Sequence, residues 1–198
     1  VTVSGAHTLA LGSLSAMNSD SVGQSVTLNV ASGTITDGRS EDAASTDGTD
    51  ITAGSLSITT TALGTASDAI ETRVDTLSLT VGSGGAYVAE YDALTLSSAS
   101  VAGVLNLSSG ALTVTSATAG NTSLTATGAT QINSLTSTGN VSLTATGNTA
   151  ITALSAAGTV DLTITGEAAI TSLTAASSVS VTVSGAHTLA LGSLSAMN

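Results

Sequence analysis

Apolar and polar residues alternate along most of this chain, in short runs that end at a glycine. The clearest example is the segment LTATG at residues 124–128, where Leu124 and Ala126 are expected on one face of a strand and the threonines on the other. Alternation with a period of two is typical of a β-strand with one buried face, and glycine gives the backbone freedom for a turn. The helical spacing of apolar residues is not sustained anywhere. The pattern predicts an all-β fold.

The strand pattern repeats every 19 residues in the second half of the chain. Residues 121–139, 140–158 and 159–177 align over their whole length, and residues 178–198 form a fourth copy of 21 residues. Three series of equivalent positions are expected to form structural ladders: Leu124, Leu143, Leu162 and Val181; Gly128, Gly147, Gly166 and Gly185; Ile132, Ile151, Ile170 and Leu189. One repeat is too short to bury a core, whereas a stack of repeats does. The sequence therefore predicts a parallel β-solenoid with roughly 19 residues per regular coil.

A second and longer period is also present. Residues 1–18 recur letter for letter as residues 181–198, an offset of 180 residues. Such identity indicates a tandem array, in which this chain is one 180-residue unit with an 18-residue overlap into the next. We expect one continuous solenoid over residues 1–198 with about nine to ten coils. Its coils are expected to be irregular, with inserted loops, over residues 19–120 and regular over residues 121–198.

Composition limits the functions that this chain can have. Only 8% of its residues are charged, and Lys and Arg total 2 against 13 Asp and Glu, which gives a net charge of −11. A chain so poor in basic residues is not expected to bind nucleic acid or anionic membrane surfaces. No apolar run is long enough to cross a bilayer, so no membrane insertion of this segment is expected. Cysteine is absent, which excludes disulfides and thiolate metal sites.

Two pieces of the irregular half have a recognisable form. They read LGTASDAIETRVDTLSLTV at residues 63–81 and AYVAEYDALTL at residues 86–96. This stretch resembles the filamentous-haemagglutinin-like large exoproteins, and the regular half is similar to β-strand-repeat surface proteins. The resemblance implies a right-handed parallel β-helix, secretion across the outer membrane of a Gram-negative bacterium, and a role in adhesion or surface structure. The 180-residue period departs from that family and indicates a uniform fibre rather than a mosaic adhesin.

The insertion at residues 36–50 combines carboxylates with two glycines. The carboxylates are Asp37, Glu41, Asp42, Asp47 and Asp50. Hard cations such as calcium favour this composition, but the spacing matches neither an EF-hand loop nor the Gly-Gly-x-Gly-x-Asp nonapeptide. A solvated surface loop is therefore the favoured interpretation, with a calcium site as the alternative. No other cofactor is expected.

Enzyme activity is not expected. Hydrolases and lyases on β-helices need paired carboxylates, or a carboxylate and a base, in a cleft. His7 and His187 occupy the same repeat position, so they are not two members of one site, and the other cationic side chains are Arg39 and Arg73. Neither a catalytic triad nor a glycine-rich phosphate loop is recognisable.

The expected function is mechanical, as a stiff rod in an extracellular surface fibre. Its expected partners are copies of itself, stacked head to tail or bundled side by side. Adhesion through the inserted loops is one alternative. Tyr87 and Tyr91 either cap the core at a coil corner, which is the favoured interpretation, or form an exposed adhesive spot. Ice binding is a second alternative, because Thr-x-Thr pairs recur on the outward face of the regular coils. These are Thr125, Thr127, Thr144, Thr146, Thr163 and Thr165.

Overall fold

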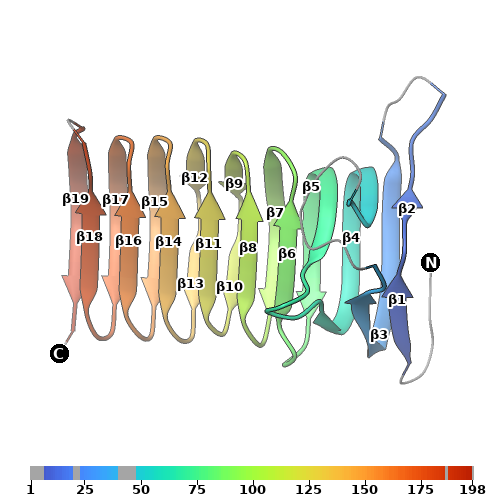
Figure 1. The fold of residues 1–198 in the computed structure, drawn as a ribbon. Helices are drawn as coiled ribbons and strands as arrows, with labels where there is room; N and C mark the ends of the chain where they lie inside the picture. Colours follow the sequence, from blue (N-terminus) through green and yellow to red (C-terminus); the bar gives the residue numbers. More distant parts are fainter. Residues whose placement is uncertain (1–6, 20–22, 40–47, 186, 198) are drawn as a thin grey trace.

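The computed structural model describes residues 7–19, 23–39, 48–185 and 187–197. Within these residues all regular structure is β-strand, and every pairing between strands is parallel. Figure 1 shows the coils side by side in a row, with β1 at one end and β19 at the other. The prediction of an all-β parallel solenoid is confirmed.

The strands differ in length between the two halves of the chain. The first ten are β1 (Thr8–Leu11), β2 (Leu14–Ser15), β3 (Ser25–Asp37), β4 (Ile51–Leu63), β5 (Ile70–Val81), β6 (Ala86–Glu90), β7 (Leu94–Val101), β8 (Leu105–Ser109), β9 (Leu112–Val114) and β10 (Ala117–Ala119). The others are β11 (Thr122–Ala126), β12 (Thr130–Ile132), β13 (Leu135–Ser137), β14 (Val141–Ala145), β15 (Thr149–Ala156), β16 (Val160–Ile164), β17 (Ala168–Ala175), β18 (Val179–Val183) and β19 (Leu189–Ala196). The longest, β3 to β5, all lie in the irregular half.

Each regular coil contributes strands to two faces of the solenoid. Face A carries β6, β8, β11, β14, β16 and β18, which have five residues each. Face B carries β7, the pairs β9–β10 and β12–β13, and then β15, β17 and β19. Along β14 the residues are alternately buried and exposed, as the period of two predicts. Stacking the coils joins the buried positions into one continuous core.

The core is built from columns of small and medium-sized apolar residues. Leu124 pairs with Leu143, Leu143 with Leu162, and Leu162 with Val181, so that these four form one column on face A. The first three are at most 1% exposed. With almost no aromatic residues, the chain fills the narrow interior with stacked leucine, isoleucine, valine and alanine.

The second apolar series follows the predicted column until its last member. Ile132 pairs with Ile151, and Ile151 pairs with Ile170, but the next partner of Ile170 is Leu191. The prediction of Leu189 at this position is wrong, because Leu189 pairs with Ala168 instead. The fourth coil has two more residues than the others, and they lie in the turn between β18 and β19. An insertion in a turn shifts the numbering of the following strand without changing which face it occupies.

The irregular half contains fewer coils than its length predicts. Leu14 pairs directly with Ile51, a separation of 37 residues in one coil. β3 also pairs with β4 in two parts with a register shift between Val30 and Thr34, and the chain turns from one face to the other there. The solenoid therefore has about eight turns rather than the predicted nine to ten, because inserted residues lengthen some turns without adding new ones.

Candidate functional site

The structure brings together carboxylates at the base of the acidic insertion. Asp37 is the last residue of β3, and Asp50 directly precedes β4. The three other carboxylates of the predicted calcium loop, Glu41, Asp42 and Asp47, lie outside the described residues. Asp37 and Asp50 lie close together in space, and the third carboxylate beside them comes from another strand.

That partner is Glu71 of β5, which the sequence analysis missed. One carboxylate oxygen from each of Asp37, Asp50 and Glu71 lies within 4.8 Å of the other two. All three side chains are buried, with 9%, 1% and 2% of their surface exposed, respectively. The site gathers carboxylates from three strand ends that are far apart in the sequence but adjacent in the stack.

Backbone groups hold one oxygen of each aspartate in this cluster. The Asp37 Oδ1 atom accepts a hydrogen bond from the Arg39 N–H at 2.7 Å, and Asp50 Oδ2 accepts one from the Glu71 N–H at 3.0 Å. The Asp50 N–H in turn donates to the Glu71 carbonyl at 2.9 Å. Asp37 Oδ2, Asp50 Oδ1 and Glu71 Oε2 are buried and have no hydrogen-bond partner among the described residues. Each carboxylate therefore keeps one unsatisfied oxygen inside the protein.

Burial raises the pKa of two carboxylates of this cluster, Asp50 and Glu71. Desolvation raises the pKa of Asp50 to about 8, and the nearby Glu71 and Asp37 side chains raise it further against the Glu71 N–H, which lowers it. Desolvation also raises the pKa of Glu71, and the charges of Asp37 and Asp68 add to this effect. The cluster is costly to keep fully ionised, so it favours either shared protons or a bound cation.

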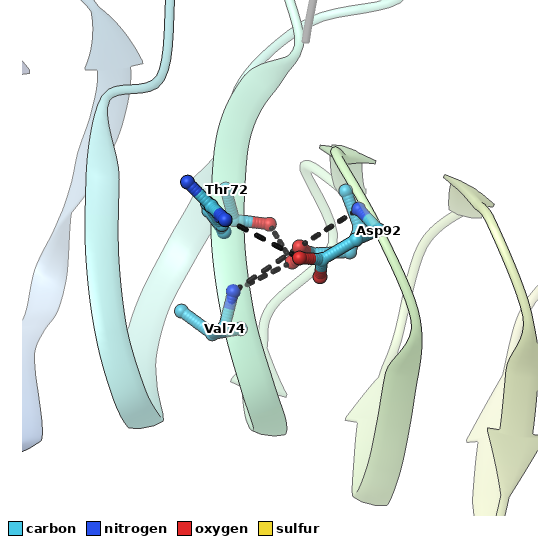
Figure 2. A network of polar contacts seen from close by, with 5 residues as sticks. Thr72, Val74 and Asp92 are labelled. Atoms are coloured by element: carbon cyan, nitrogen blue, oxygen red, sulfur yellow. Dashed lines mark hydrogen bonds and ion pairs between the residues drawn. The ribbon is translucent and has the colours of Figure 1, made fainter. Parts of the chain in front are cut away.

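A fourth buried carboxylate, Glu90 at the end of β6, has a different environment. Figure 2 shows Thr72 and Val74 on one strand facing Asp92, with the carboxylate between them as acceptor. Glu90 Oε2 accepts from the Thr72 hydroxyl at 2.7 Å, and its two oxygens accept from the Val74 N–H at 3.1 and 3.2 Å. Desolvation still dominates and raises the pKa of Glu90 to about 7. Glu90 therefore links the end of β6 to β5 of the preceding coil through these hydrogen bonds.

Three exposed side chains, Arg73, Tyr91 and Asp92, form a cluster close to Glu90 in the sequence and in the stack. The Arg73 guanidinium lies 5.3 Å from the centre of the Tyr91 ring, and Arg73 Nε is 3.5 Å from Asp92 Oδ2. Tyr91, which follows β6, is 41% exposed, whereas Tyr87 within β6 is half-buried. Of the two predicted roles for the tyrosines, packing therefore describes Tyr87 better than Tyr91.

The predicted turn glycines and threonine ladder lie in the regular half. Gly128, Gly147 and Gly166 follow β11, β14 and β16, and Gly185 follows β18 with a φ of 90°. All six threonines are exposed. One rank, formed by Thr125, Thr144 and Thr163, lies within the strands in direct register. The other rank, Thr127, Thr146 and Thr165, lies beyond the strand ends, where the Thr146 hydroxyl donates to the Thr127 carbonyl.

Comparisons with known proteins do not assign this chain to a family, so it is described by its fold class. No protein-family model, curated protein or solved structure matches it. Among the described residues, no helix is long and apolar enough to span a bilayer. The stacked coils define a parallel β-solenoid protein, and its function has to be argued from its geometry.

Proposed function

We propose that this chain is a segment of a stiff, continuous rod in an extracellular fibre built from tandem 180-residue units. Parallel stacking supports a rod, because each coil offers the next one a row of backbone donors and acceptors. The resemblance of residues 63–96 to filamentous-haemagglutinin-like exoproteins supports secretion to the surface of a Gram-negative bacterium. The partners of each unit are then the identical units before and after it.

The repeated segment, residues 1–18 and 181–198, supports this proposal most directly. One copy pairs through one edge of its strand and the other copy pairs through the opposite edge. In the second copy, Leu191 pairs with Ile170 of the preceding coil and remains 46% exposed at the end of the stack. In the first copy, the equivalent Leu11 pairs with Asp37 of the following coil and is 6% exposed. One segment therefore has a compatible partner strand on each edge, as a coil inside a continuous rod requires.

The pairing register also sets the rotation between neighbouring units. From Leu9, the column of paired residues on face A passes through eight successive pairings to Val179. Leu189, the copy of Leu9, lies on face B, half a turn further along the chain. A 180-residue unit then contains about eight and a half turns. Consecutive units in the rod are thus related by a half-turn about its axis.

Strand lengths at the two ends are consistent with this half-turn. At the C-terminal end, face A finishes with the five-residue β18 and face B with the eight-residue β19. At the N-terminal end the widths are exchanged: face A carries β1 and β2, which span residues 8–15, and face B carries the six paired residues 25–30 of β3. A half-turn at the junction places long strands on long strands and short on short.

Labelled tandem units test the proposal. The chain has no cysteine, so Ser67→Cys in an exposed loop gives one attachment point per unit for a gold or biotin label. Electron micrographs of a protein with several tandem units are expected to show unbranched rods that lengthen by about 41 Å per unit, from eight and a half turns at ~4.8 Å. Successive labels are expected on alternate sides of the rod.

Two outcomes would contradict this arrangement in different ways. Separate globular bodies on a string would refute the continuous rod. Straight rods with all labels on one side would keep the rod but refute the half-turn between units. An unlabelled protein with the natural Ser67 serves as the control for the effect of the label on rod length.

A further inference from the structure

We propose that Asp37, Asp50 and Glu71 form a binding site for a calcium-sized divalent cation. The three oxygens lie within 4.8 Å of one another. Three oxygens that surround one ion at the usual calcium–oxygen distance of roughly 2.3 to 2.6 Å lie about 4.0 to 4.5 Å apart, so the cluster is close to the size that calcium requires. Oxygen ligands alone are the set that hard cations such as calcium prefer, and calcium completes its coordination shell with carbonyl oxygens or water.

The unsatisfied oxygens are a second and independent indication of a ligand. Asp50 Oδ1 and Glu71 Oε2 belong to side chains that are 1% and 2% exposed, and neither atom has a hydrogen-bond partner among the described residues. A buried polar atom without a partner destabilises the fold, and a buried charge does so more strongly. Backbone N–H groups already occupy the opposite oxygen of each aspartate, so the free oxygens are held in place.

The charge around the cluster also favours a cation. Asp68 adds a further negative charge near Glu71. Three buried carboxylates need either protons or a counter-ion, and a divalent cation compensates most of their charge at once.

A bound cation would join two successive coils of the solenoid, because Asp37 and Asp50 lie at the same level and Glu71 lies in the next coil. Asp37 ends β3, Asp50 begins the approach to β4, and Glu71 lies in β5, where it exchanges backbone contacts with Asp50. Asp37 and Asp50 also flank the acidic insertion, because β3 ends at Asp37 and β4 begins directly after Asp50. The cation therefore acts as a clamp at the base of the insertion, a role that is separate from the stacking of tandem units.

The test compares thermal unfolding of the chelator-stripped protein with and without calcium at slightly alkaline pH. Calcium at about one hundred times its Kd is expected to raise the Tm by roughly 5 to 10 °C. Magnesium is expected to raise it less, because it requires a tighter octahedral shell. Sodium chloride at matched ionic strength measures the contribution of charge screening alone.

Two variants separate a cation site from a merely structural cluster. Asp50→Asn combined with Glu71→Gln removes two of the buried charges, so this variant is expected to equal or exceed the wild type in stability without calcium and to gain nothing from it. Asp75→Asn on β5 removes an exposed charge from the same strand and is expected to keep the full response to calcium. Equal responses to calcium and sodium chloride, or a calcium response in the double variant, would overturn the proposal.

Discussion

Replacing Gly147 by Ala is expected to destabilise the regular half of the solenoid by about 3 kcal/mol. A Cβ atom at this position would lie 2.4 Å from the carbonyl carbon of Gly128 and 2.5 Å from its oxygen. Both are backbone atoms of the preceding coil, which is itself tied by the Gly128 N–H to the Gly110 carbonyl at 2.9 Å. The clash can be relieved only by moving one coil relative to the next, which lengthens the hydrogen bonds between strands. Urea unfolding followed by far-UV circular dichroism measures the loss.

Gly12→Ala is the matched control for this substitution. No atom lies within 4 Å of a Cβ built on Gly12, so the change is expected to leave stability unaltered or to increase it by about 0.5 kcal/mol through the unfolded state. Gly166→Ala repeats the test one coil later, because its Cβ would lie 2.5 Å from the Gly147 carbonyl carbon. If all three variants unfold at the same urea concentration, the close stacking of the turns is wrong.

The regular half was predictable because solenoid stacking turns a sequence period into a spatial contact. Residues 19 apart, such as Leu124 and Leu143, become direct neighbours, so the series of equivalent positions was also a list of contacts. The same logic fails where the period changes. Leu189 was assigned from spacing alone, but two additional residues in the preceding turn bring Leu191 to that column instead.

The buried carboxylates were only partly predictable. Asp37 and Glu90 occupy inward positions of their strands, in phase with buried Ile35 and Val88, so the period of two carried a signal for both. Glu71 gave no such signal, because Ile70, Glu71 and Thr72 are buried in succession and the alternation is lost there. Alternation assigns Glu71 to the outer face, and only the structure shows that it is buried beside Asp37 and Asp50 of the neighbouring coil.

The two halves therefore differ in what stabilises them. The regular coils bury apolar columns and four hydroxyl side chains, Thr122, Thr130, Ser137 and Thr149, but no carboxylate among their described residues. Within the part of the chain that the structure describes, the irregular coils bury four carboxylates, Asp37, Asp50, Glu71 and Glu90, at or near the ends of their strands. Protons and cations are therefore expected to act mainly on the irregular half.

Stability is expected to fall as the pH rises through 7, and Glu90→Gln is expected to remove a large part of this fall. Burial raises the pKa of Glu90 from 4.5 to about 7, so the folded state prefers the neutral carboxyl. The stability that this preference provides is fully present below about pH 4.5 and is lost as the pH rises through 7. A shift of this size corresponds to on the order of 3 kcal/mol. Urea unfolding at pH values below 4.5 and above 7 measures the difference.

Glutamine keeps the contacts of Glu90 without its charge. Its amide oxygen can accept from the Val74 N–H, and its amide nitrogen can donate to the Thr72 hydroxyl, which then acts as acceptor. The other buried carboxylates titrate in both proteins, so the difference between the two pH profiles isolates Glu90. Glu90→Ala also lacks the charge but leaves the Val74 N–H without its partner, so it is expected to be less stable at every pH. A Glu90→Gln profile that parallels the wild type would show that Glu90 is ionised in the folded protein throughout this range.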